Sequence, residues 1–224
     1  AHDLRDEIEL NPIVRKVELN LLYEMNFVPN DPRLSEQWAL NNDGQSVNGR
    51  SGVSDVDIDW FEALDLYTGA GQKIVAVIDS GVALDHPDIT NSLWINPGEL
   101  NDGIDNDGNG FVDDIVGWDF AENDGIPLDK NGHGTLVASI IAGETGNNLG
   151  ISGVAPDAQI MVLRVGNNVD QVIGSALCEA MEYAIIMNAD VVNFSIGSGS
   201  PSFCQESLIN IMNDFGMLFV ASAG

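Results

Sequence analysis

The central and C-terminal parts of the chain alternate between continuous apolar runs and segments with helical periodicity. The apolar runs, which predict strands, lie at 73–79, 158–165, 190–196 and 217–221. Helices are predicted at 57–66, 133–142 and 171–187, with a fourth that begins at Ser202, whose spacing to Gln205 matches a capping box. The apolar stripe of the third helix consists of Ile173, Ala176, Leu177, Ala180, Met181 and Ala184. Strands that alternate with helices predict an α/β protein with a mainly parallel sheet and helices on both faces.

Two other regions have different patterns. Residues 90–130 are rich in Gly, Asn and Asp and are predicted to be loops. In residues 1–25, apolar and polar positions alternate from Val17 to Tyr23, which predicts a half-buried strand after a turn at Asn11-Pro12. The prolines in residues 26–33 indicate a boundary before the α/β part.

Composition narrows the class of protein. The chain has 224 residues, 44% of them hydrophobic, which is enough for one domain with a full core. With 8 basic and 35 acidic residues the net charge is −27, which excludes a general nucleic-acid binder and disfavours an anionic membrane surface. No apolar run reaches the roughly 20 residues of a membrane-spanning helix. The charge favours a protein that binds cations or works outside the cell.

Only two cysteines are present, Cys178 and Cys204. Two cysteines are too few for a disulfide framework. They can form a single bridge or be two small buried residues, and the sequence leaves both alternatives open.

Two short motifs carry candidate chemistry. Asp79-Ser80-Gly81 follows the first strand, at the edge of the sheet where parallel α/β proteins place their sites. A hydroxyl donor on Ser80 would help to keep Asp79 ionised. His133 lies between two glycines at the start of a predicted helix, where another group can approach its imidazole. Taken singly, the first motif is typical of a turn and the second of a loop.

Taken together, these motifs resemble those of the subtilisin-like serine proteases. Four further segments agree in the family's order: 85–88, 150–156, 192–197 and 219–224. The resemblance implies a three-layer sandwich, hydrolysis of polypeptides, and a catalytic pair in which Asp79 orients His133, the general base. It also implies that the substrate backbone pairs with the cleft strand and that Asp170, in the segment 169–172 beside the cleft, favours a basic substrate residue. The implied substrate-binding residues are Asp170, Asn193, Ser195, Ile196 and Gly197.

The chain departs from the family pattern at its C-terminal end. It contains no Gly-Thr-Ser motif to supply the nucleophile, and the Asn of the oxyanion hole would directly follow Gly224. We therefore expect an α/β domain that is incomplete at its C-terminus and is inactive by itself. The alternative is a non-catalytic, calcium-binding, protease-like module, and the residues after Gly224 would decide between them. Leu136 and Ser139 replace the family's usual His and Gly, for which we expect only a packing change.

The N-terminal segment resembles the end of the family's inhibitory propeptide. On this interpretation residues 1–25 are a propeptide remnant and residues 26–224 are the N-terminal part of the catalytic domain. Maturation is then expected between Tyr23 and Val28, and the protein is expected to be secreted with its propeptide as an inhibitor. The alternative is an ordinary N-terminal strand of the domain.

Calcium is the expected cofactor at two places. Asp105, Asp107 and Asn109 alternate before a glycine as in the start of an EF-hand loop, and the alternative is a solvated acidic surface. Val116 stands where the closing Glu would be, so Asp114 is expected to close the site, with the carbonyl of Phe111 as a further ligand. A second site is implied by the family resemblance alone. Its predicted ligands are side chains of Asp31, Asp88 and Asn147 and backbone carbonyls of Glu144, Leu149 and Ile151.

Overall fold

A computed structural model describes residues 29–66, 72–166, 171–197 and 202–223. Its centre is a five-stranded parallel sheet in the order β4-β5-β3-β6-β7. The strands are β3 (Ile74–Asp79), β4 (Gly117–Asp119), β5 (Gln159–Arg164), β6 (Val191–Phe194) and β7 (Leu218–Ala221). The helices are α2 (Trp60–Leu66), α3 (His133–Ala142), α4 (Gly174–Ile186) and α5 (Phe203–Asp214). The predicted parallel α/β architecture is confirmed.

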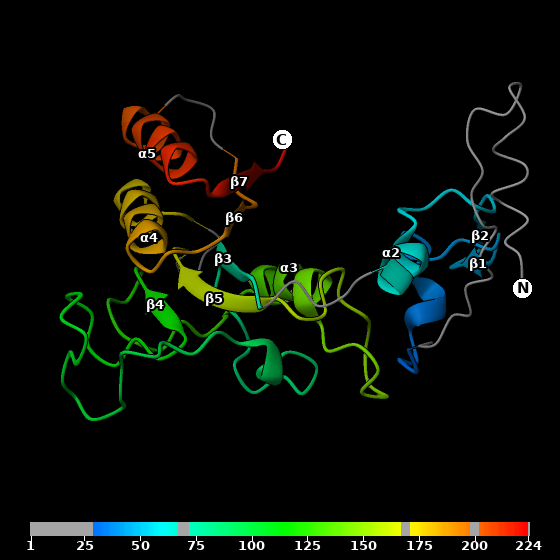
Figure 1. Cartoon of the computed structure of the whole chain (residues 1–224), viewed down its shortest axis with the longest axis horizontal. Coiled ribbons are helices and arrows are strands. Elements are labelled where there is room, and N and C mark those ends of the chain that lie inside the picture. The colour runs from blue at the N-terminus through cyan, green and yellow to red at the C-terminus, as the bar shows by residue number, and fades with distance from the viewer. Residues whose placement is uncertain (1–28, 67–71, 167–170, 198–201, 224) are drawn as a thin grey trace, which may run out of the picture.

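Helices cover both faces of this sheet. Along β3, Ala76 and Ile78 belong to the apolar cluster that includes α4 and α5, whereas Val75 and Val77 pack in the cluster that includes α3. This alternation explains why the run is apolar at every position, since each residue of β3 faces one helical layer or the other. Figure 1 shows α4 and α5 together at one side and α3 beside β5.

Helix α3 matches its predicted range and has one exposed side, where Leu136 and Ile140 are 66% and 57% exposed. Helix α4 begins at Gly174, so Ile173 is its N-cap and is 44% exposed, while the rest of the predicted stripe is buried. The cap predicted for α5 is present, and Ser202 Oγ accepts a hydrogen bond from the Gln205 N–H at 3.5 Å.

The region 90–130 contains a strand that the sequence pattern does not predict. β4 has only three residues and pairs with the edge of β5, where Trp118 lies opposite Leu163. The next residue of β4, Asp119, forms a buried ion pair with Arg164 of β5. These contacts are made with residues more than 40 positions away, so no local periodicity marks the strand.

The residues before β3 form a smaller apolar cluster of Leu40, Trp60 and Phe61. It is joined to the main part through Trp60, whose indole N–H donates to the Val154 carbonyl at 2.9 Å. Figure 1 shows α2 here together with a short antiparallel pair, β1 (Ser46–Val47) and β2 (Arg50–Ser51). Helix α2 begins three residues later than predicted, because the Asp57 carboxylate instead accepts the Asp59 N–H in a turn.

A disulfide between Cys178 of α4 and Cys204 of α5 settles the alternative that the sequence leaves open. The described residues include no helix long and apolar enough to cross a membrane. The strand predicted near Val17 to Tyr23 lies outside the described residues, as does the proposed propeptide boundary.

Candidate active site

Asp79 and His133 meet at the carboxyl end of β3. Asp79 is the last residue of the strand and His133 is the first residue of α3. The imidazole Nδ1 lies 2.8 Å from Asp79 Oδ1 and 3.0 Å from Oδ2. The Asp79 side chain is 4% exposed, whereas that of His133 is 55% exposed. A buried carboxylate therefore holds one ring nitrogen and leaves the rest of an accessible imidazole free to react.

Glycines permit this close approach of strand and helix. A Cβ on Gly134 would lie 2.2 Å from the Gly81 carbonyl and 3.1 Å from the Asp79 carboxylate. Gly81 itself has φ +102°, and a Cβ there would lie 2.6 Å from the Pro127 carbonyl. Side chains at these positions would push the start of α3 away from Asp79.

Ser80 supports the pair differently from the prediction. Its backbone N–H donates to Asp79 Oδ1 at 2.7 Å and so adds a hydrogen bond to the carboxylate that holds His133. Its hydroxyl donates instead to Asp129 at 2.9 Å. Asp129 is a further residue of this region that the motif analysis did not single out.

A cleft of about 450 Å³ opens beside the pair. The described residues that line it come from the ends of β3, β5 and β6, from the start of α3 and from the segment before α4: Asp79, Ser80, Asn131, His133, Gly166, Val172, Ser195, Ile196 and Gly197. Three of the predicted substrate-binding residues, Ser195, Ile196 and Gly197, are therefore together on the cleft wall. Asn193 adjoins them through its side-chain amide, which donates to Ser195 Oγ at 3.0 Å. Asp170 lies outside the described residues, although Val172 of the same predicted segment lines the cleft.

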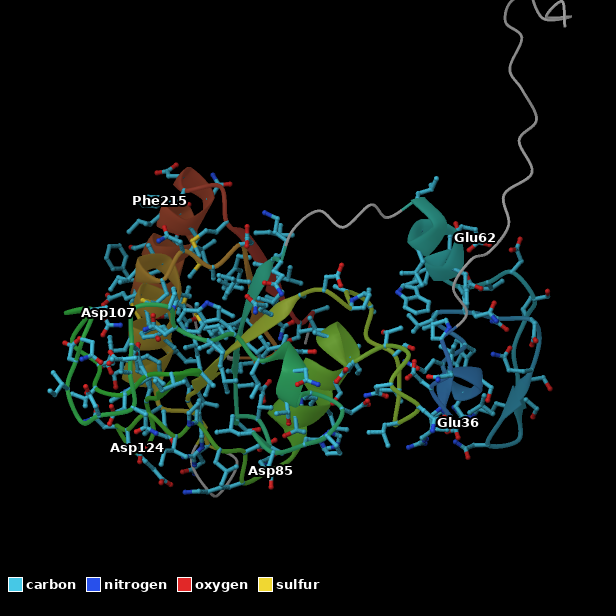
Figure 2. The ribbon with its side chains drawn as sticks, turned by 60° about the horizontal axis from the view of Figure 1, so that its bottom comes forward. Glu36, Glu62, Asp85, Asp107, Asp124 and Phe215 are labelled. Carbon is cyan, nitrogen blue, oxygen red and sulfur yellow. A yellow bond between two sulfur atoms is a disulfide. The ribbon has the colours of Figure 1, made fainter. Side chains whose placement is uncertain are left out.

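The acidic loop, defined as residues 99–114 and marked by Asp107 in Figure 2, brings several predicted metal ligands together. Carboxylate oxygens of Asp105, Asp107 and Glu99 lie within 4.8 Å of one another. Glu99 is only 5% exposed and lies just before the motif, so EF-hand spacing alone does not find it. Asp105 also accepts the Gly108 and Gly110 N–H groups at 2.7 and 2.9 Å, which folds the loop around this carboxylate. Three hard oxygen donors at this separation fit a calcium ion.

Two other predicted ligands of this loop, Asp114 and Phe111, contact the core through their side chains. Asp114 is fully buried and accepts the Tyr183 hydroxyl at 2.5 Å and the Asn109 amide at 2.8 Å. Burial, together with this hydrogen bond, raises the pKa of Tyr183 far above its ordinary value, so the phenol remains a donor. The Phe111 ring packs edge-on against Tyr183 with ring centroids 5.0 Å apart. These contacts fasten the acidic loop to α4.

The residues of the second predicted calcium site also lie together. Asp31 and Asp88 are 5% and 2% exposed, and both face the segment 144–151. Gly146 N–H donates to Asp31 at 2.9 Å, and the Asn147 amide donates to Asp88 at 2.8 Å. An ion between these carboxylates would require Asn147 to present its oxygen instead.

The three residues predicted to bind through backbone carbonyls make these contacts through other groups. The Glu144 carboxylate accepts the Asn91 amide at 2.8 Å, and the Ile151 N–H donates to Asp88 at 3.0 Å. Leu149 N–H donates to the Asn147 side-chain oxygen at 2.7 Å. N–H groups of the segment 144–151 thus surround the carboxylates of Asp31 and Asp88. The residues predicted to supply carbonyl ligands belong to this same segment.

A carboxylate–imidazole pair at the mouth of a cleft is the arrangement that hydrolases use to activate a hydroxyl or thiol nucleophile. Residues 71–224 match the model of the subtilase family. The chain is 30% identical over 214 residues to the thermophilic serine proteinase of Bacillus sp. (strain AK1), covering 96% of this chain and 45% of that protein. It is 32% identical over 163 residues to thermitase of Thermoactinomyces vulgaris, covering 73% of this chain and 50% of thermitase.

Halolysin of Haloferax mediterranei is 32% identical over 211 residues, covering 94% of this chain and 35% of halolysin. The chain therefore belongs to the subtilase family. It spans half or less of the length of these relatives.

Proposed function

We propose that the protein containing this chain is a serine endopeptidase of the subtilisin-like type, in which Asp79 and His133 act with a serine located beyond Gly224. The observation that carries the proposal is the hydrogen-bonded pair at the cleft, with its carboxylate buried and its imidazole accessible. The chain of 224 residues has no Gly-Thr-Ser motif, so we expect it to be inactive when produced alone.

In this proposal each member of the pair has its own role. An ionised Asp79 accepts the Nδ1 proton and so fixes the tautomer in which Nε2 of His133 carries a lone pair. Nε2 takes the proton of the serine hydroxyl as the oxygen attacks the peptide carbonyl, and the imidazolium then donates that proton to the leaving amine. The resulting acyl-serine ester is hydrolysed by water in the reverse sequence of proton transfers. The buried negative charge of Asp79 stabilises the imidazolium in both steps.

The residues that line the cleft support the proposal that the substrate is a polypeptide. Residues 195–197 continue from β6 and line the cleft, where the backbone of an extended peptide can pair with them as an added strand. We also propose that Asp170 favours a basic residue of the substrate by charge complementarity. Recognition through the backbone accounts for binding of many sequences, with side-chain preference added at the cleft walls.

Calcium is proposed as the structural cofactor. In the acidic loop Glu99, Asp105, Asp107 and Asn109 would hold the ion together with the Phe111 carbonyl, and Asp114 would close the site from the core side. A second ion would lie between Asp31 and Asp88. A bound ion would offset repulsion between neighbouring carboxylates and add stability that depends on free calcium.

Secretion and inhibition by a propeptide complete the proposal. The disulfide between α4 and α5 favours an oxidising compartment, since cytosolic proteins rarely keep such bonds. Residues 1–25 are proposed as the end of the inhibitory propeptide, with maturation between Tyr23 and Val28.

The test is hydrolysis of an unfolded protein substrate by the full-length protein, followed by mass spectrometry of the products. Cleavage at internal peptide bonds, abolished by His133→Ala, is the expected result. The chain of 224 residues should give no products. Absence of hydrolysis by the mature full-length protein, with calcium still raising its melting temperature, would favour the non-catalytic calcium-binding module.

A further inference from the structure

The carboxylate of Asp129 lies at the centre of a hydrogen-bond network beside the candidate active site. Asp129 Oδ1 accepts the Ser80 hydroxyl at 2.9 Å and the N–H groups of Asn131 and Gly132 at 2.9 and 2.8 Å. Its Oδ2 accepts the Thr135 N–H at 3.0 Å and the Thr135 hydroxyl at 2.5 Å. One side chain therefore collects donors from the end of β3, from its own loop and from the first turn of α3.

Two further bonds extend this network across the strand–helix junction. The Ser80 hydroxyl oxygen accepts the Gly134 N–H at 2.9 Å, and Thr135 Oγ1 accepts the Ala83 N–H at 3.0 Å. The N-cap of α3 is a glycine without a capping side chain, so Asp129 and Ser80 satisfy N–H groups that a cap residue would otherwise serve. A negative charge at this end of the helix also has a favourable interaction with its dipole.

The bonds of this network lie on both sides of the Asp79–His133 pair. Ser80 directly follows Asp79, and the glycines bound by Asp129 and Ser80 flank His133. Asp129 itself is not among the described residues that line the cleft. We propose that Asp129 is a positioning residue that holds His133 against Asp79 by locking the start of α3 to the end of β3.

The negative charge of Asp129 is essential to this role. Burial alone would raise the pKa of Asp129, but the donors from Gly132, Thr135 and Asn131 outweigh it and hold the pKa below its ordinary value. An asparagine has nearly the same shape, but its NH₂ group cannot accept a hydrogen bond and would face one of these N–H or O–H groups. Misplacement of a reacting group by about 1 Å can cost about 100-fold in rate.

The experiment compares Asp129→Asn and Ser80→Ala with Asp85→Asn in the full-length protein. Asp85 is an exposed carboxylate in the turn after β3 (Figure 2), so its substitution removes the same charge without touching the network. The kinetic measurements rest on the proposed function, and kcat is calculated per folded molecule, with the folded fraction taken from circular dichroism. A second readout is independent of activity: the low-field NMR resonance of the His133 Nδ1–H, assigned by its absence from His133→Ala.

For Asp129→Asn we expect kcat to fall 10- to 100-fold with KM changed less than twofold, and the Nδ1–H resonance to move upfield or be lost to exchange. Ser80→Ala should give a smaller loss in kcat, and Asp85→Asn should leave both readouts unchanged. If Asp129→Asn does not fold, the same measurements of kcat and of the Nδ1–H resonance on Ser80→Ala test the proposal. Unchanged kcat per folded molecule together with an unchanged resonance would overturn the proposal. If the wild-type protein hydrolyses no peptide, the proposed function fails, and the resonance alone then decides the role of Asp129.

Discussion

The Asp79 carboxylate and the His133 imidazole are hydrogen-bonded at 2.8 Å although one side chain is buried and the other is more than half exposed. The burial of Asp79 keeps water from competing for Nδ1, and the exposure of His133 leaves its other nitrogen open to the cleft. This asymmetry is what a general base requires, because the group that orients it must be sheltered while the base itself meets the substrate.

Removal of the negative charge of Asp79 tests this division of roles. We expect Asp79→Asn in the full-length protein to lower kcat by about 10⁴-fold, because the amide stabilises neither the required tautomer nor the imidazolium. KM should change little, since Asp79 is buried and does not present its charge to substrate. Steady-state kinetics on a peptide substrate provide the measurement. A loss of less than tenfold would show that another group orients His133.

The disulfide between Cys178 and Cys204 should contribute strongly to stability. It closes a loop with a sequence separation of 26 residues, for which loss of chain entropy in the unfolded state predicts about 3–4 kcal/mol. We expect the double variant Cys178→Ala/Cys204→Ala to lose stability of this order in urea unfolding. Wild-type protein treated with reductant is the matched comparison, and it should approach the variant. A change below about 1 kcal/mol would contradict the entropic argument, which rests on the principle of loop closure.

Calcium should raise the melting temperature through the acidic loop. Chelator is expected to lower the melting temperature, calcium to restore it, and magnesium to restore it poorly because magnesium demands a stricter octahedron. At 100 times the dissociation constant, calcium bound only to the folded state adds about 2.7 kcal/mol.

The variant Asp105→Ala/Asp107→Ala should lose most of this response, and Glu99→Gln a part of it. Asp85→Asn, which also removes a single negative charge, is the matched control for Glu99→Gln. A melting curve that chelator does not move would show that the acidic loop is only a solvated surface.

The loss of stability at low pH should depend on Asp129. Its pKa in the folded state is lowered, so its contribution to stability is fully present above the unfolded value of about 3.9 and is lost as pH falls through the folded value. We therefore expect the free energy of unfolding of wild type to fall more steeply below about pH 4 than that of Asp129→Asn. Urea titrations at several pH values measure the two slopes, and equal slopes would refute this assignment.

The sequence is sufficient to predict the main sheet, because each of its longer strands coincides with a continuous apolar run. β4 is not predictable in this way, since Trp118 pairs with Leu163 and its three residues are too few to show a period. The same limit applies to the site. Asp79 and His133 lie in recognisable motifs. Glu99 and Asp129 contact their partners only because loops of the folded chain bring them together, and residue spacing in the sequence does not reveal such contacts.

The pairing of Cys178 with Cys204 and the hydroxyl contact of Ser80 illustrate a further limit. Each depends on the distance between two elements, which is set by how α4 packs on α5 and how α3 meets β3. Local sequence supplies the reactive group in both cases, and tertiary packing chooses its partner.

The most direct test of the central claim is labelling of the full-length protein with a fluorophosphonate probe, followed by peptide mapping. We expect one serine to be labelled, at a position after Gly224, and the labelling to be lost in His133→Ala while Asp85→Asn is labelled like wild type. The chain of 224 residues should remain unlabelled. No labelling of the mature full-length protein, or stoichiometric labelling of a serine within residues 1–224, would contradict the assignment of Asp79 and His133 to a serine-peptidase triad completed beyond this chain.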